Sequence, residues 1–251
     1  MFTKTGRDTG EIKFQTFSKG FSVEDGGRGE ILGVQFEDDF LGPTLDAYKW
    51  TAATEGTSAA AAITAALNGT VQLDTGTAAD KRNIIASGLN WAASRTVTFE
   101  TRLRTVTSDT GIFLFAGLTD SIDKGSGKLP LKDGSLASGS IDAWADDLVG
   151  FGVRAETSDN IYCTSCIAAA TPQTGDSGTD LTLSTWYVLR IELDSDGNAE
   201  FFINGTSVDT QEDAVTAADP LCGYVGAMIT TGSTAAFVDI DYVHLYQSRT
   251  A

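Results

Sequence analysis

The amino-acid sequence predicts an all-β protein built as an antiparallel β-sandwich. Three observations support this prediction: long periodic helices are missing, several segments alternate between apolar and polar residues, and the chain has 27 glycines but only 4 prolines. Glycine-rich turns and alternating segments rich in Thr, Val and aromatic residues are typical of sheets. With 251 residues and 41% hydrophobic content, the chain can bury one sizeable core, so one main domain is expected.

The N-terminal segment differs in composition from the rest of the chain. Phe14, Phe17 and Phe21 are scattered among Lys, Gly, Asp and Thr in a segment with loop chemistry. We therefore divide the chain into an extended N-terminal arm, residues 1–33, and a β-sandwich domain, residues 34–251. Such an arm is either a frayed terminus or a segment that orders on a partner. The three phenylalanines favour partner binding.

The middle of the chain contains several predicted strands. Residues 95–106 alternate, which predicts a strand with one buried face, and residues 111–118 are apolar on both faces, which predicts a central strand. Residues 148–155 and 160–168 are predicted to form two strands around a turn. Residues 58–67 are rich in alanine and fit a short helix or a small-residue strand about equally well. The polar face of the first strand carries Thr98, Glu100, Arg102 and Arg104.

Residues 120–147 form a long polar excursion that interrupts the strand pattern. This segment is too long for an ordinary sandwich turn, and loops of such length often have a function. Three interpretations stay open: a binding rim, a contact between subunits, or a solvated decoration.

The last third of the chain predicts a hairpin and a long closing strand. Residues 186–193 alternate and are followed by a turn and a second strand, residues 199–203. Asn204 and Gly205 supply the positive φ angles that a two-residue type I′ hairpin turn needs. Residues 237–246 then form the closing strand.

These segments resemble the concanavalin A-like lectin/glucanase (LamG-like) jelly-roll superfamily. The run W-x-x-L-R-I-E-x-D-x-D-G-x-x-x-F-x-I-N-G begins at Trp186, and a D-Y-V-x-L-Y run lies in the last strand. The opening of the domain, from Glu37 to Trp50, similarly carries D-D-F followed by L-D and W. The resemblance implies a jelly roll, which serves capsids and lectins alike and so leaves the function open.

No pattern typical of catalysis accompanies the predicted fold. In the glucanase branch of the superfamily, the catalytic carboxylates lie on one strand in an E-x-D-x-E or E-x-D-x-x-E run, because alternate residues share a face. The nearest approach in this chain is Asp239 and Asp241, and Val243 follows where a third acid is needed. A Ser-His-Asp triad would need the single His244, without a G-x-S-x-G motif. We therefore expect no enzyme activity.

The cysteines and the histidine raise the question of a metal. Cys163, Cys166, Cys222 and His244 are four soft ligands, the number that a tetrahedral zinc site requires. Residues three apart in an extended strand face opposite ways, however, unless a turn intervenes. Zinc and a local disulfide stay open as minor alternatives, and ordinary reduced or buried cysteines are expected, with no metal and no cofactor.

The turn at residues 194–198 is a second candidate for a metal ion. Asp194, Asp196 and Asn198 offer oxygen ligands that suit calcium. The same D-x-D-G-N pattern is typical of a plain hairpin turn, and no distal glutamate accompanies it. The turn interpretation is favoured.

The charge of the chain excludes one class of partner. The formal net charge is −17 and the sequence pI is about 4.2, whereas binding to phosphates needs clustered Lys and Arg, so nucleic acid is not expected as a partner. Residues 1–30 hold no apolar signal region, and no run of 18 apolar residues follows. Secretion by signal peptide and membrane spanning are therefore not expected.

Two tryptophans are candidates for a ligand site. Lectin-like sandwiches hold sugars with exposed aromatic rings and convergent polar groups, and Trp91 and Trp144 are the rings that could serve here. Each is alternatively a buried anchor, which is the commoner role of tryptophan in a sandwich.

Three features together resemble lectin-like structural proteins of tailed bacteriophages. They are the polar arm, the G-L-T-D-S run at residues 117–121, and the D-D-L-V-G-F-G-V-R run at residues 146–154. The resemblance implies a non-catalytic capsid decoration or other virion surface protein, assembled in the host cytoplasm, homo-oligomeric, and attached to other virion proteins through Phe14, Phe17 and Phe21. The alternative is a carbohydrate-binding, lectin-like module.

Overall fold

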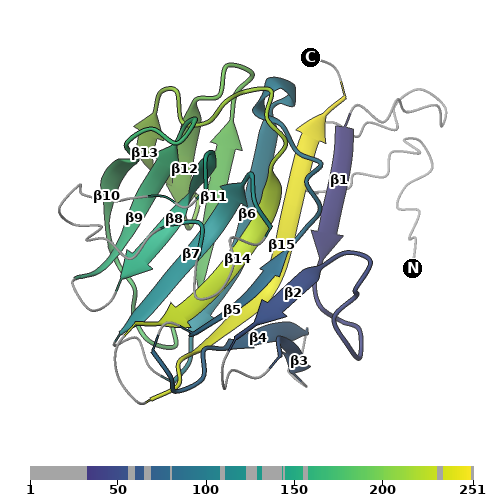
Figure 1. The fold of residues 1–251 in the computed structure, drawn as a ribbon, viewed down its shortest axis with the longest axis vertical. Coiled ribbons are helices and arrows are strands. Elements are labelled where there is room, and N and C mark those ends of the chain that lie inside the picture. Colours follow the sequence, from purple (N-terminus) through teal and green to yellow (C-terminus); the bar gives the residue numbers. More distant parts are fainter. Residues whose placement is uncertain are drawn as a thin grey trace, which may run out of the picture.

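The computed structural model describes residues 33–55, 60–64, 69–79, 81–107, 111–122, 129–131, 143, 145–154, 158–230 and 234–249. These residues form two antiparallel β-sheets that pack face to face (Figure 1). The predicted all-β sandwich is confirmed. Among the described residues, no helix is long and apolar enough to span a membrane.

Sheet A contains both ends of the described chain. Its strands lie in the order β13 (Thr206–Gln211), β12 (Ala199–Ile203), β11 (Tyr187–Leu193), β6 (Val97–Thr105), β15 (Phe237–Ser248), β4 (Thr70–Asp74) and β3 (Ala62–Thr64). The long strand β15 pairs with β6 along one side, and its other side pairs first with β4 and then with β1 (Gly33–Asp38). Figure 1 shows β1 beside β15 at the edge of the sheet.

Sheet B is formed mostly by the middle of the chain. Its strands lie in the order β10 (Gln173–Asp180), β9 (Ser158–Cys166), β8 (Leu148–Arg154), β7 (Ile112–Thr119), β14 (Cys222–Ile229), β5 (Lys81–Ala86) and β2 (Thr51–Thr54). A short 3-10 helix, η1 (Ala93–Arg95), precedes β6. β7 and β8 lie inside the sheet and both of their faces are covered, which fits sequences that are apolar except for Thr119 and Arg154 at their ends.

The predicted strands are found with small shifts at their ends. The hairpin turn between β12 and β13 is confirmed, because Asn204 and Gly205 both have positive φ angles, 51° and 82°. The side chain of Asn204 also accepts a hydrogen bond from the backbone N–H of Val188, at 2.9 Å. Within the alanine-rich segment, Ala62–Thr64 forms strand β3, so the strand alternative holds for these residues.

The D-D-F…W opening of the domain forms a small aromatic cluster. The indole N–H of Trp50 donates a hydrogen bond to Oδ2 of Asp38 at 2.8 Å. The Trp50 ring packs edge-on against Phe36, with 5.0 Å between ring centroids, and tilted against Phe40 at 5.8 Å. These contacts hold the loop after β1 against the core, which explains the spacing of the motif.

The main core lies between the two sheets, and a second apolar cluster covers the outer face of sheet B. Phe115 and Tyr224 belong to this second cluster, together with Leu129, Leu131 and Ala145 from the long excursion. A Cβ atom on Gly226 would lie only 2.7 Å from Tyr224 Cε1 and 2.9 Å from Leu129 Cδ2, so a side chain at this position would force its neighbours to shift. The described part of the excursion is therefore packed on sheet B and is not a solvated decoration.

Candidate functional site

The outer face of sheet A holds an open groove of about 770 Å³. It crosses β13, β12, β11, β6 and β15 near the turn that joins β11 to β12. Its described lining consists of Thr96, Thr98, Glu100, Arg190, Glu192, Leu193, Asp194, Asn198, Ala199, Glu200, Thr210, Gln211, Glu212, His244, Tyr246 and Ser248. Polar side chains predominate, and among these residues Arg190 is the only Lys or Arg.

The strand register arranges the groove residues in rows across the sheet. Glu100 lies directly between Arg190 on β11 and His244 on β15. One row further along, Thr98 lies between Glu192 and Tyr246. Residues directly opposite on neighbouring antiparallel strands have Cβ atoms roughly 4.5–5.5 Å apart, so these side chains are in contact range.

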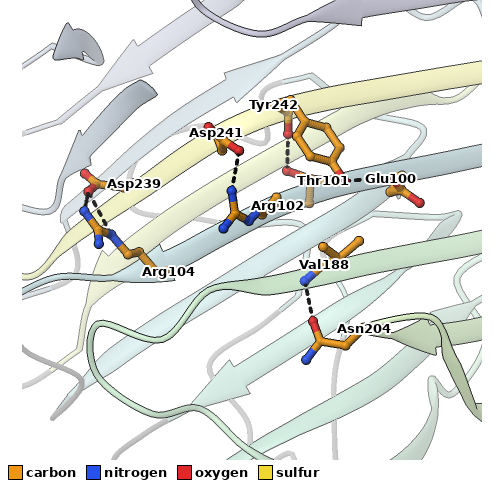
Figure 2. Close-up of polar contacts among 9 residues, drawn as sticks. All are labelled: Glu100, Thr101, Arg102, Arg104, Val188, Asn204, Asp239, Asp241 and Tyr242. Carbon is orange, nitrogen blue, oxygen red and sulfur yellow. Dashed lines mark hydrogen bonds and ion pairs between the residues drawn. The ribbon is translucent and has the colours of Figure 1, made fainter. Parts of the chain in front are cut away.

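Glu100 is the most buried acid of the groove, with 8% of its surface exposed. The hydroxyl of Tyr242 donates a hydrogen bond to its Oε1 atom at 2.7 Å (Figure 2). Burial and this hydrogen bond raise the pKa of Tyr242, which therefore keeps its proton at neutral pH. The Tyr242 hydroxyl can therefore donate to the Glu100 carboxylate at neutral pH, and this hydrogen bond orients the carboxylate.

His244 lies beside Glu100 and is 4% exposed. Burial lowers the pKa of His244, while the nearby Glu37 and Glu100 act in the opposite direction without reversing the shift. The imidazole is therefore neutral at pH 7.

Arg190 is held by two neighbours on the surface of the sheet. Its guanidinium lies over the ring of Phe202, with 4.1 Å between Cζ and the ring centroid, and its Nε atom is 3.5 Å from Oε1 of Glu192.

Glu192 in turn lies directly opposite Glu200 on β12. Glu200 accepts a hydrogen bond from the hydroxyl of Ser207 at 2.7 Å. The two glutamates thus occupy opposite positions on neighbouring strands in the floor of the groove.

One end of the groove is formed by the turn that raised the question of calcium. Oδ1 of Asp194 accepts hydrogen bonds from the backbone N–H groups of Asp196 and Asn198, each at 2.9 Å, and Oδ2 accepts one from the Asn198 amide at 2.8 Å. Burial raises the pKa of Asp194, but these hydrogen bonds outweigh it and lower the pKa overall. Asp194 therefore accepts hydrogen bonds from within its own turn, which is the hairpin-turn role favoured from the sequence.

The aromatic ring of the groove belongs to Tyr246. Its ring lies against Gly33 on β1, where any Cβ atom would collide with Cε2 of the ring. Gly33 is the last residue of the predicted arm and the first residue of β1. The absence of a side chain at Gly33 thus leaves room for the Tyr246 ring beside β1.

Next to the groove, two arginines of β6 pair with two aspartates of β15 (Figure 2). Arg104 donates from Nε and Nη2 to Oδ2 of Asp239 at 3.2 and 2.9 Å, and Arg102 donates to Oδ2 of Asp241 at 2.8 Å. The Cζ atoms of both arginines lie 4.6 Å from the ring centroid of Trp186. Asp239 and Asp241, the nearest approach to a catalytic pair in the sequence, are therefore both engaged in ion pairs across the sheet.

Of the two tryptophans proposed from the sequence, the structure describes only Trp91. Trp91 is 3% exposed and belongs to the main core, so it is a buried anchor and not a platform for a ligand. Trp144 lies outside the described residues, as do Phe14, Phe17 and Phe21 of the arm.

The three cysteines and the histidine are located in different parts of the sandwich. Cys163 faces the main core, whereas Cys166 and Cys222 face the second cluster, and all three are free thiols. Cys222 and Cys166 are separated by β7 and β8, roughly 14 Å at a spacing of about 4.8 Å per strand. His244 is on the other sheet. The four side chains cannot bind one ion, and no group of three or more possible ligands occurs among the described residues.

Comparisons with known proteins identify the fold. No protein-family model and no curated protein sequence matches the chain. Among solved structures, a protein of unknown function from Shewanella oneidensis MR-1 has 17% identity and a TM-score of 0.55, with 86% of this chain and 87% of that chain covered. A Bacillus licheniformis β-glucanase has 10% identity and a TM-score of 0.58, with 86% and 98% covered.

The carbohydrate recognition domain of Emp47p is a further structural neighbour. It has 10% identity and a TM-score of 0.55, and the match covers 85% of this chain and 95% of that domain. The protein therefore has the concanavalin A-like lectin/glucanase jelly-roll fold that the sequence motifs imply. At these identities the likeness shows the fold alone.

Proposed function

We propose that the protein is a non-catalytic binding protein that holds a glycan in the groove on the outer face of sheet A. The observation that carries this proposal is the groove itself, which joins the exposed side of Tyr246 to a floor of carboxylates and hydroxyls. Glycan sites combine an aromatic surface for the apolar face of a sugar ring with polar groups that fix its hydroxyls. The sheet supports these groups on paired strands, which limits their movement.

The carboxylates of the groove can accept hydrogen bonds that sugar hydroxyls donate. Ionised carboxylates are pure hydrogen-bond acceptors, and hydrogen bonds to charged groups are stronger than those between neutral groups. Glu100 is fixed by Tyr242, and Glu200 by Ser207, so neither carboxylate needs to be ordered on binding. The glucanase and the carbohydrate recognition domain share the fold, and they support the proposal by analogy only.

Two features support the absence of catalysis. Asp239 and Asp241 are neutralised by arginines, as described above. The outer face of sheet B is covered by the second apolar cluster, which includes Leu129 and Leu131. We therefore expect no release of reducing ends from β-glucans or galactans. Release that is abolished by Asp239→Asn or by Glu192→Gln would show that the protein is a hydrolase.

The virion surface role predicted from the arm remains a separate proposal. It requires the protein to be present on purified particles, where mass spectrometry measures its copy number. A chain that starts at Gly33 should fold but fail to load onto particles that lack the protein. Equal loading of the shortened and full chains would show that the arm is not needed for attachment.

A substitution of Tyr246 tests the glycan proposal directly. Tyr246→Ala should weaken binding to an oligosaccharide identified on a glycan array by about tenfold, which corresponds to about 1.4 kcal/mol. Tyr48→Ala is the matched control, because Tyr48 is 102% exposed and lies outside the groove. An equal loss of binding in both variants, or in neither, would place the ligand elsewhere.

A further inference from the structure

We propose that the groove selects glycans that carry free amino groups, such as deacetylated polymers of 2-amino sugars, over neutral and anionic saccharides. This inference rests on the proposed function, because it names the class of glycan that the same groove takes. It is based on the balance of charges in the described lining of the groove, where Arg190 stands against five acids, and on two glutamates at opposite positions on neighbouring strands.

The charged groups of the groove are mostly acidic. The carboxylates come from three strands and two turns, so they belong to the folded surface and not to a single run of the sequence. They are those of Glu100, Glu192, Asp194, Glu200 and Glu212, against the guanidinium of Arg190. A groove lined by one sign of charge concentrates ligands of the opposite sign. Uronic acid chains and phosphorylated saccharides are therefore expected to bind poorly.

The positive charge of Arg190 offsets one of these carboxylates and leaves the others in excess. Its guanidinium lies over the ring of Phe202, and its Nε atom is 3.5 Å from Oε1 of Glu192. His244 adds no positive charge at pH 7, because burial keeps it neutral. Glu200 and Glu212 have no cation among the described ion pairs. The groove as a whole keeps a negative charge.

Glu192 and Glu200 provide the specific position for an amino group. They lie directly opposite on β11 and β12, an arrangement in which like charges disfavour the folded state. Arg190 offsets the charge of Glu192 in part, at 3.5 Å, whereas Glu200 has no cation among the described ion pairs. An ammonium group between the two glutamates would remove the remaining repulsion and donate up to three hydrogen bonds. Charge-assisted hydrogen bonds to carboxylates are the strong class of such contacts. A neutral acetamide at the same position would leave the repulsion in place.

The inference is tested by calorimetric titration with saccharides of equal length. The ligands are oligomers of glucosamine, of N-acetylglucosamine and of glucuronic acid, with trilysine as a peptide that carries the same kind of charge. The glucosamine oligomer should bind about three- to tenfold more tightly than its acetylated form, the range expected for two partly exposed ion pairs. This preference should shrink in 1 M salt, where the Debye length falls to ~3 Å from ~10 Å at 0.1 M.

Matched variants assign the preference to the two glutamates. The double variant Glu192→Gln with Glu200→Gln should bind the two forms of the oligomer equally, so the preference for the glucosamine form should be lost. Asp219→Asn is the control, because Asp219 is exposed and does not line the groove. It removes one negative charge and should preserve the preference.

The outcomes separate this inference from the proposed function. If no saccharide binds, both the proposed function and the inference fail. If the acetylated and deacetylated oligomers bind equally to the unaltered protein, the glycan proposal stands and the selection for amino groups is wrong. If trilysine binds as tightly as the glucosamine oligomer, the groove recognises positive charge alone, which also overturns the inference.

Discussion

Tyr242 on β15 donates a hydrogen bond to Glu100 on β6, with 2.7 Å between the hydroxyl oxygen and Oε1 (Figure 2). The two residues are 142 positions apart in the sequence. The contact is possible because β15 and β6 are neighbours in sheet A. It fixes the most buried carboxylate of the groove in one orientation, so it links the stability of the sheet to the geometry of the candidate site.

Tyr242→Phe should destabilise the protein by about 1–2 kcal/mol. The substitution removes the hydroxyl donor and leaves the buried Glu100 carboxylate with one fewer hydrogen bond, a loss of the size found for bonds to charged groups. Urea denaturation measures the change in the free energy of unfolding. Tyr48→Phe, at a fully exposed tyrosine, should have an effect within about 0.5 kcal/mol. Equal stability of the two variants would show that the bond contributes nothing.

Arg104→Met should cost about 1–3 kcal/mol of stability. Asp239 has a side chain that is only 7% exposed and would lose both of its hydrogen bonds from Arg104. Gln72 would remain as a donor to its other oxygen, at 2.7 Å. The range corresponds to hydrogen bonds with a charged acceptor. Arg104→Lys keeps the positive charge and should lose less stability, and an equal loss would point to packing against Trp186 instead.

The stability of the protein should depend on the protonation of His244. Its pKa in the folded state is lowered, chiefly by burial, whereas the pKa of an unfolded histidine is about 6.5. The unfolded chain therefore binds more protons as the pH falls below about 6.5, and the stabilising contribution that is present above this pH is lost. Glu37 and Glu100, which face the imidazole from β1 and β6, oppose the effect without cancelling it.

Urea denaturation at about pH 7.5 and about pH 5.5 tests this pH dependence. The unaltered protein should lose more free energy of unfolding between these values than the variant His244→Gln, because the variant has no group that titrates at this position. Glu37 and Glu100 remain in both proteins, so the difference isolates the histidine. Parallel losses would mean that the imidazole is as easily protonated in the folded protein as in the unfolded chain.

The three thiols should be inert in the folded protein. Burial raises the pKa of Cys166 to about 11 and that of Cys222 to about 12, and it raises the pKa of Cys163 as well. The thiolate is the reactive form, so a thiol reagent at neutral pH should modify the cysteines only after unfolding. Rapid modification of one cysteine in the native protein would contradict its described position in the core.

The sequence predicts strands well where one face is buried and where turns have a clear chemistry. The alternation around Glu100 and around Glu192 places both acids correctly on polar faces, and Asn204 marks its hairpin. Two other strands carry no such signal. β5 begins with Lys-Arg-Asn, although Arg82 is 1% exposed and pairs with Glu55 at 3.5 Å. β10 is an edge strand of Gln, Thr, Gly, Asp and Ser, with no buried residue.

The groove itself could not be predicted from the sequence, because it depends on which strands are neighbours. Glu100 and Arg190 are opposite one another only because β6 pairs with β11. Glu192 and Glu200 are eight positions apart, and the hairpin between β11 and β12 brings them together. The alternating pattern gave the face of each residue, and the predicted turn at residues 194–198 was the one signal from which the second pair could have been found.

NMR shows on which face of the sandwich a saccharide binds. Backbone amide shifts are followed while the glucosamine oligomer is added to the full chain. We expect changes concentrated at Thr98, Glu192, Glu200 and Tyr246 on the outer face of sheet A. Changes concentrated at Phe115, Tyr162 and Tyr224, on the outer face of sheet B, would contradict this expectation, as would the absence of any change with every saccharide tested.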